Sequence, residues 1–316
     1  MSNARKLADN LPSVGQLGGR NKLINGAMEI FQRGTSFTNS SAAYNADRWS
    51  VDNNAGGGGQ STDAPDGFTY SLKIDPSSGN AALRQAIELP AAGEGGVFRS
   101  GQKFTVSFYV KSDNAGEAIN IFAASGTSVS ATTTAQVSAQ TIGTTTTSWV
   151  RHIFTFTSNN VGGSDTCYNI VPFVVSPSGD TYWTGFQLEE GSQASPFEHE
   201  PVGVTLSKCH RYTFVHQTDS DYDWAALSGY CNTTTNALSF YQFPVRMRAS
   251  PTLTTTGSFQ LLDGFTSYTI SSSSLSQSSP LSARVDIASS GLTVGRHIAV
   301  RNLGDSGAKL IFSAEL

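Results

Sequence analysis

Hydrophobic and polar residues alternate one by one along most of this chain. Phe104, Val106, Phe108 and Val110, for example, alternate with threonine, serine, tyrosine and lysine. A period of two places one row of side chains in a core and the other in water, so each such run predicts a β-strand. Similar runs occupy residues 68–74, 83–89, 119–123, 149–156, 168–175 and 182–188. Many short strands separated by glycine, serine and asparagine predict a β-sandwich. Residues 125–148, rich in threonine and serine, fit an exposed edge hairpin or a mobile loop.

Residues 196–201 interrupt the alternation with proline, glutamate and histidine, which is typical of a linker. We therefore expect an all-β protein with two β-sandwich domains, residues 21–200 and 201–316, since 316 residues suffice for two cores. Strands of the second domain are predicted at 211–215, 227–231, 238–245, 252–256, 281–287, 298–302 and 310–314. The polar residues 1–20 cannot build a core, and we expect an extended N-terminal docking arm there.

Composition narrows the possible partners. Only 14% of the residues are charged, the net charge is −4 and the pI is about 5.7, so no nucleic-acid partner is expected. No apolar run is long enough to span a bilayer and residues 1–19 lack a signal-peptide core, so we expect no membrane insertion and no export by the usual signal. Cys167, Cys209 and Cys231 show no metal-ligand spacing and are expected to be buried free thiols, as suits a reducing cytoplasm.

Residues 21–49 hold the most informative local pattern. Asn25-Gly26 is a turn signal, and Met28 and Ile30 alternate with Glu29 as in a half-buried strand. Gly34 would end that strand. Trp49, on the next predicted strand, and Trp183 are expected to be core residues.

The asparagine-glycine turn, the glutamate of the first strand and the tryptophan of the next resemble the opening of jelly-roll carbohydrate-binding modules. With Gln32-Arg33-Gly34 and Asp47-Arg48-Trp49, the segment is similar to tail-fibre and related virion structural proteins of marine bacteriophages. Three further blocks resemble the same proteins, in the same order: residues 183–191 with 195–198, residues 208–212, and residues 243–252 with 314–316. His210 stands where that family has glutamine, and Thr213 where it has a second tyrosine. The resemblance implies a jelly-roll-like virion part and supplies no catalytic residues.

The sharpest candidate site is the loop formed by Asp219, Asp221, Tyr222, Asp223 and Trp224. Its carboxylates at alternate positions could hold calcium, although a helix-loop-helix calcium site would need glycine and glutamate where Trp224 and Tyr230 stand. The rings suit the C–H faces of a pyranose, and the carboxylates suit its hydroxyls. Packing at a subunit contact explains the rings equally well, and a solvated loop explains the acids.

Two further groups near the first strands have a functional and a structural interpretation. Glu29 corresponds to an acid that holds a structural calcium in related sugar-binding jelly rolls, but Gly185 stands where the second acid would lie. Arg33, Asp47 and Arg48 flank Trp49 and are expected to form a stabilising ion pair rather than a ligand site.

For catalysis the sequence offers little. The five histidines are scattered, and no nucleophile elbow, phosphate loop or zinc signature appears. Cys209 and His210 would point to opposite faces of a strand. Paired carboxylates that meet only in the fold stay possible. We expect no cofactor, no bound metal and no enzyme.

The expected function is that of a phage tail-fibre or appendage subunit, most simply a homotrimer. It would dock to other virion proteins by its N-terminus and adhere to a host surface glycan, after assembly in the host cytoplasm. The alternatives are a purely structural head-decoration or tail adaptor protein and, third, an accessory carbohydrate-binding module.

Overall fold

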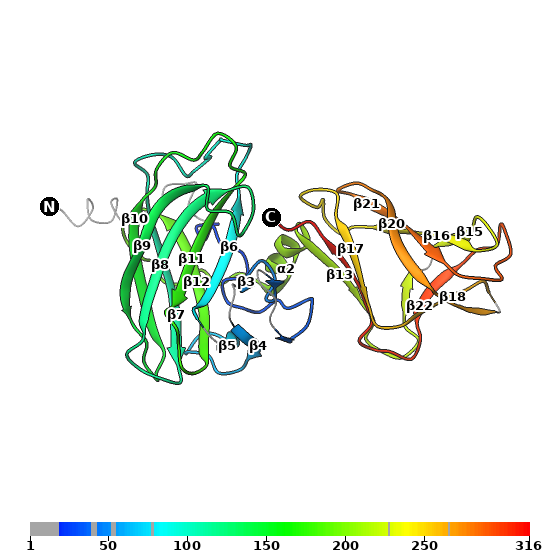
Figure 1. Ribbon diagram of the computed structural model, residues 1–316, viewed down its shortest axis with the longest axis horizontal. Coiled ribbons are helices and arrows are strands. Elements are labelled where there is room, and N and C mark those ends of the chain that lie inside the picture. The colour runs from blue at the N-terminus through cyan, green and yellow to red at the C-terminus, as the bar shows by residue number, and fades with distance from the viewer. Residues whose placement is uncertain (1–18, 39–42, 52–54, 77–78, 227, 265) are drawn as a thin grey trace. The chain divides into compact units, whose positions relative to one another are not determined.

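The computed structural model describes residues 19–38, 43–51, 55–76, 79–226, 228–264 and 266–316. The chain divides into two compact units, residues 1–201 with Leu316 and residues 202–315. The predicted docking arm, residues 1–20, lies almost wholly outside the described residues. The prediction of an all-β protein built of sandwiches is confirmed (Figure 1).

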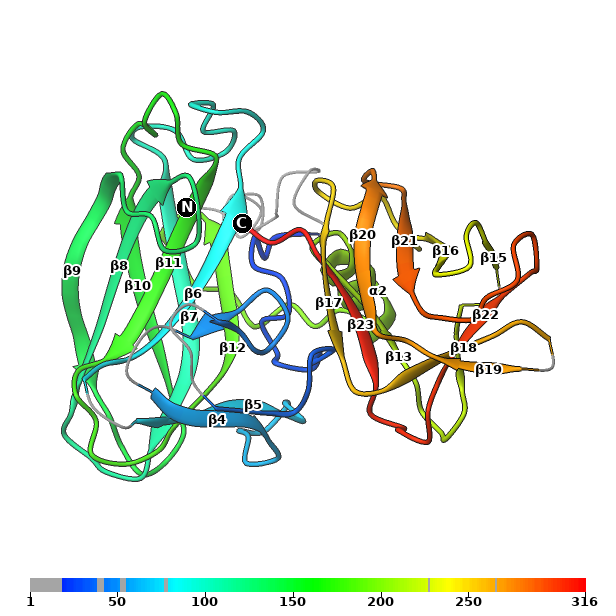
Figure 2. The same ribbon diagram turned by 45° about the vertical axis from the view of Figure 1, so that its right-hand side comes forward.

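The described part of the N-terminal unit forms two six-stranded antiparallel sheets. Sheet I has the strand order β1 (Ser36–Thr38), β4 (Ala55–Ser61), β5 (Ser71–Pro76), β12 (Thr181–Glu190), β7 (Lys103–Ser112) and β10 (Val150–Thr157). Sheet II has the order β2 (Ala43–Tyr44), β3 (Ser50–Val51), β6 (Ala81–Glu88), β11 (Cys167–Val174), β8 (Ala118–Gly126) and β9 (Thr134–Thr144). Strands β6, β11, β8 and β9 of sheet II lie side by side in Figure 2. Of the two interpretations of 125–148, the edge strand is correct, because β9 ends sheet II.

The core of this unit contains the two predicted tryptophans. Trp49 and Trp183 are fully buried, as expected. The Trp49 ring centroid lies 4.4 Å from that of Phe186, and Phe186 lies 5.2 Å from Phe108. Each indole N–H is satisfied, by the Asn25 carbonyl at 3.0 Å and by the Thr181 hydroxyl at 2.8 Å. These hydrogen bonds, together with the packing, fix the position of each buried ring.

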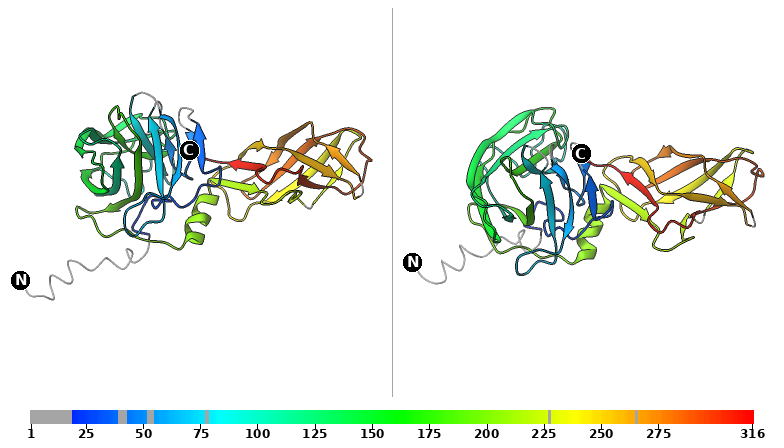
Figure 3. Two further views of the ribbon diagram at one scale, coloured as in Figure 1. Left: turned by 90° about the horizontal axis from the view of Figure 1, so that it is seen from below. Right: turned by 60° about the horizontal axis from the view of Figure 1, so that its bottom comes forward.

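The described C-terminal unit begins with the helix α2 (Val202–His210), the coiled ribbon in Figure 3, and continues as three small antiparallel sheets. One has the order β13 (Thr213–Gln217), β23 (Lys309–Ser313) and β17 (Thr252–Thr256). The second has the order β14 (Trp224–Ala226), β22 (Ala299–Asn302), β18 (Phe259–Leu262) and β19 (Ser267–Thr269). The third has the order β15 (Gly229–Cys231), β16 (Asn236–Gln242), β21 (Ser282–Ala288) and β20 (Ser272–Ser278). Phe312 packs in its core against Tyr241 and Phe243.

Three local predictions are wrong. Residues 28–30 form no strand, because Asn25 and Met28 have φ angles of 57° and 54° and turn the chain instead. Cys209 and His210 end helix α2, where successive side chains point about 100° apart rather than to opposite faces. The helix was missed because valine and threonine favour strands, yet a four-residue spacing buries Thr205 and Cys209 on one side. Strand β5 begins at Ser71, later than predicted.

The three cysteines are free and buried, as predicted.

Candidate functional site

A row of four side chains crosses the outer face of sheet I. The register pairs Tyr182 of β12 with Lys73 of β5 on one side and with Lys111 of β7 on the other. Val150 pairs with Val110, so Trp149, the residue before β10, continues the row beside Lys111. The neighbouring positions Leu72, Trp183 and Val110 are buried, and the row therefore points away from the core. We call Lys73, Tyr182, Lys111 and Trp149 the aromatic row.

Acidic side chains hold the lysines of this row in place. The Asp63 carboxylate accepts a hydrogen bond from the Lys111 ammonium and another, at 3.0 Å, from the Trp149 indole N–H. Lys111 Nζ also lies 5.2 Å from the centre of the Tyr182 ring. Asp180 forms an ion pair with Lys73 at the opposite end. Both rings are half-buried, and each is held by a contact with a charged side chain.

The pKa values at the row agree with this geometry. The hydrogen bond from Lys111 lowers the pKa of Asp63, and the hydrogen bond to Asp180 raises the pKa of Lys73. Both groups therefore stay charged at neutral pH. Burial raises the pKa of Tyr182, whose hydroxyl stays protonated and can donate to a ligand.

A second aromatic group lies beside the row. Tyr109 of β7 contacts Phe68 at 5.5 Å between ring centres, and Phe68 contacts Phe197 at 4.9 Å and His199 at 5.3 Å. These rings cover a bulge in β12, where the register shifts between Thr184 and Gln187.

Gly185 lies in this bulge with a φ of 67°. A Cβ there would come within 2.7 Å of Tyr109 and 2.8 Å of Phe68, so this position has no room for the acid of the calcium hypothesis. Glu29 is half-buried; its burial raises the pKa, and the charge of His199 partly offsets that rise. Residue 185 is therefore a glycine because Tyr109 and Phe68 leave no room for a side chain. The second acid that the calcium hypothesis requires at this position is absent.

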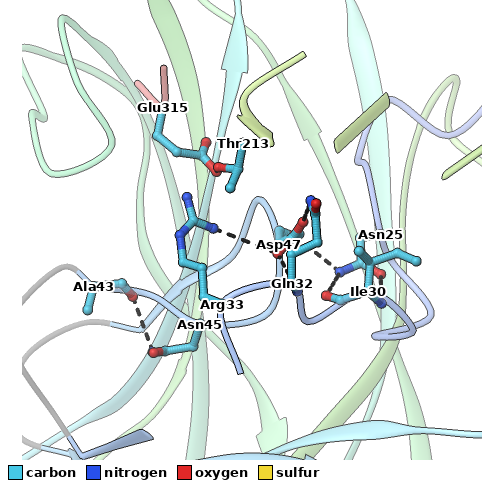
Figure 4. Close-up of polar contacts among 9 residues, drawn as sticks. All are labelled: Asn25, Ile30, Gln32, Arg33, Ala43, Asn45, Asp47, Thr213 and Glu315. Carbon is cyan, nitrogen blue, oxygen red and sulfur yellow. Dashed lines mark hydrogen bonds and ion pairs between the residues drawn. The ribbon is translucent and has the colours of Figure 1, made fainter. Parts of the chain in front are cut away.

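Figure 4 shows the polar contacts around the first turn. Arg33 forms an ion pair with the fully buried Asp47 at 3.7 Å, which confirms the structural interpretation of this pair. The Asp47 carboxylate also accepts hydrogen bonds from the backbone and side-chain amides of Gln32. The Asn25 side chain donates to the Ile30 and Asp47 carbonyls, at 2.9 and 3.1 Å. Arg48 is buried and donates to the Ala86 carbonyl, so these charges serve the fold.

The loop from Asp219 to Trp224 lies in the C-terminal unit and ends at the start of β14. Its two rings flank one guanidinium, since Arg301 Cζ lies 4.9 Å from the Tyr222 ring centre and 5.8 Å from that of Trp224. Tyr222 is 51% and Trp224 42% exposed. The carboxylate of Asp223 accepts from the backbone amides of Asp219 and Trp224, at 3.1 and 2.8 Å, and these bonds lower its pKa.

Asp219 and Asp221, the other acids of the predicted site, flank Ser220, whose carbonyl accepts from Asn302 at 2.7 Å. Within the described ranges, no group of three or more histidine, cysteine, aspartate or glutamate side chains is placed to hold a metal ion. The same ranges contain no helix long and apolar enough to cross a membrane.

No protein-family model matches this sequence, and no curated protein matches it. Solved carbohydrate-binding modules are similar in fold. A CBM4 structure is 19% identical, covering 53% of this chain and 98% of its own, with a TM-score of 0.34. TmCBM61 in complex with β-1,4-galactotriose is 17% identical, covering 55% and 100%, with a TM-score of 0.34. The CBM22-1-CBM22-2 tandem domain of Xyn10C from Paenibacillus barcinonensis is 9% identical, covering 94% and 98%, with a TM-score of 0.35. Likeness at this level carries no functional argument.

The aromatic row was not among the sequence-derived site residues. Lys73 and Lys111 were predicted to face water, and Tyr182 and Trp149 each began a predicted strand. A large ring at the outward position of an alternating strand is the signal that points to such a surface. The row becomes visible only with the strand order β5, β12, β7, β10, in which no two neighbours are consecutive in sequence.

Proposed function

We propose that the N-terminal unit binds a glycan on the aromatic row without cleaving it, and that the protein thereby serves as an adhesion subunit of a phage appendage. The observation that carries the glycan proposal is the register that places Tyr182 and Trp149 on either side of Lys111. The ring faces suit the C–H groups of a pyranose. The adjoining lysine and aspartate side chains suit its hydroxyl groups.

The charges of the row favour binding over hydrolysis. Glycoside hydrolysis needs a carboxylic acid that holds its proton and donates it to the leaving oxygen. Lys111 lowers the pKa of Asp63, the carboxylate within the row, so this group is a poor proton donor. A lysine also neutralises Asp180 at the far end of the row. We therefore assign the row an adhesive role, in which many copies on one particle raise a weak single-site affinity.

Calorimetry tests this proposal after a glycan array of bacterial surface polysaccharides has supplied a ligand. Tyr182→Ala and Trp149→Ala should each weaken binding by about tenfold, equivalent to about 1.4 kcal/mol. Tyr230→Ala removes a ring that is 42% exposed in the other unit and is the matched control. No reducing ends should be released from the bound polysaccharide. Equal affinity in all three variants would remove the aromatic row as the site.

The placement in a virion is supported by the sequence resemblance. We propose that residues 1–20 dock on other virion proteins and that the subunit is a homotrimer. Native mass spectrometry should show three copies at micromolar concentration, and a monomer would contradict the trimer. Deletion of residues 1–19 should leave both units folded and abolish incorporation into the particle. A truncated protein that assembles normally would rule out the docking role.

The loop from Asp219 to Trp224 is a second surface for contact with the host, because it presents two exposed rings beside Arg301. If the protein is instead a purely structural head-decoration or tail adaptor protein, the loop would contact another subunit or another virion protein. Accessibility in the assembled oligomer separates the two roles. Rings that react with a surface-labelling reagent in the oligomer fit host contact, and rings protected there fit an interface.

A further inference from the structure

A cleft of about 490 Å³ opens into the interior of the C-terminal unit. It lies where β17, the end strand of one sheet, runs close to β20, the end strand of another (Figures 1 and 2). The hydroxyl groups of Thr255 and Ser273, 2.9 Å apart, bridge these two strands. The volume falls within the range of roughly 300 to 1,000 Å³ that small-molecule sites occupy.

Strand register shows that the cleft enters the core. Thr255 pairs with Leu310, which is 3% exposed, and Ser273 pairs with Ile287, which is 2% exposed. Directly paired residues share one face of a sheet, so both hydroxyl side chains point inward. Thr255 is nevertheless exposed, and it lines the cleft. The interior of the unit is therefore open at this position.

The lining consists mainly of apolar side chains, which we call the floor, and hydroxyl side chains, which we call the rim, with the exposed Leu303 also at the cleft. The floor includes Tyr241, Leu253, Phe259, Val285, Val300 and Leu310. The rim includes Thr255, Ser258, Thr269, Ser271 and Ser273. Among the described residues that line the cleft there is no aspartate, glutamate, lysine, arginine or histidine, although the Asp305 carboxylate accepts a hydrogen bond from the Ser258 amide at 3.0 Å.

This division selects the chemistry of the ligand. An anionic ligand would give up its hydration without meeting an opposite charge, which is costly. Burial raises the pKa of Tyr241 to about 12, so its hydroxyl is also neutral at physiological pH. An apolar body would gain from contact with the floor, while hydroxyl or carbonyl groups would hydrogen-bond at the rim.

We propose that this cleft binds a neutral small molecule with an apolar body and polar groups at one end. The ligand enters between β17 and β20, and its polar end exchanges hydrogen bonds with Thr255 and Ser273. This site is independent of the aromatic row, which lies in the other unit. If the aromatic row binds no glycan, the proposal for this cleft still stands.

Two fluorescent probes test the proposal on the full chain. N-phenyl-1-naphthylamine is neutral, and 8-anilino-1-naphthalenesulfonate has the same ring system with an added sulfonate. The neutral probe should bind saturably with one equivalent per chain, and the anionic probe at least about tenfold more weakly. Absence of saturable binding of the neutral probe, or equal affinity for both probes, would overturn the proposal.

Matched variants on one strand locate the site. Thr255→Trp places a ring in the mouth of the cleft and should weaken binding of the neutral probe by about tenfold or more. Thr254→Trp places the same ring on the opposite, exposed face of β17 and should leave the affinity unchanged. Ser273→Phe repeats the blockade from β20 should Thr255→Trp fail to fold. A folded Thr255→Trp or Ser273→Phe protein that binds like the wild type would place the probe elsewhere and overturn the proposal.

Discussion

The aromatic row and the loop from Asp219 to Trp224 combine similar side chains on different supports. In the row, Lys73, Tyr182 and Lys111 belong to the adjacent strands β5, β12 and β7, and Trp149 directly precedes the end strand β10, so strand register sets their spacing. In the loop, both rings lie within one short segment and flank a single arginine. The backbone of Tyr222 also has a positive φ, 62°. A surface fixed by register depends on the whole sandwich, whereas a surface fixed by a loop depends on a few local bonds.

The largest effect is expected from a substitution in the core that supports the aromatic row but not the loop. Trp49→Ala empties the core beneath sheet I and should lower the free energy of unfolding of the N-terminal unit by about 3 to 5 kcal/mol. Glycan binding on the aromatic row should be lost at the denaturant concentration at which that unit unfolds. Denaturant unfolding, followed separately for each unit by hydrogen exchange, measures both effects. The backbone amides in the core of the C-terminal unit should keep their protection from hydrogen exchange. An unchanged midpoint for the N-terminal unit would show that its core tolerates the cavity.

A smaller effect is expected at the bulge beside the row. Gly185→Asp forces a side chain against Tyr109 and Phe68 at a positive φ, and should cost about 1 to 3 kcal/mol of stability. Gly101→Asp is the matched control, because Gly101 also has a positive φ, 82°, but has no atom within 4 Å of its added Cβ. The difference between the two melting curves isolates the clash from the backbone strain. Equal losses would mean that the rings move aside without cost.

A substitution in the loop from Asp219 to Trp224 should change binding but not stability. Trp224→Ala removes a ring that is 42% exposed, so stability should change by no more than about 0.5 kcal/mol. Adsorption of assembled particles to host cells should nevertheless weaken, and oligomer size should stay the same. Normal adsorption by a correctly assembled mutant would exclude the loop as a host contact. A smaller oligomer would identify it as a subunit interface.

Sequence reasoning succeeded where a pattern within one segment determines the outcome. The alternation along Phe104 to Val110 predicted β7, and the two buried tryptophans were assigned correctly. It failed at Met28, where the positive φ of Asn25 and that of Met28 turn the chain although the residues alternate like a strand. It missed the aromatic row for a different reason. Each member has an ordinary local environment, and only the order of strands far apart in sequence brings Tyr182 next to Lys111.

The smallest expected effect concerns the charge that holds the row together. The bond from Lys111 lowers the pKa of Asp63 below its ordinary value of 3.8, so the ion pair is fully formed above that value. As the pH falls from about 3.8 through the lower folded-state pKa, Asp63 gains a proton and the pair is lost. Glycan affinity should therefore be constant near neutral pH and decline only in this acidic window, provided that the unit stays folded. Asp63→Asn cannot make this transition and should bind more weakly at neutral pH, with no decline of its own in the acidic window. Asp66→Asn, on the exposed part of the same loop, should keep the wild-type profile. Calorimetric titrations at several pH values compare the three proteins, and an identical decline in Asp63→Asn would assign the acid sensitivity to another group.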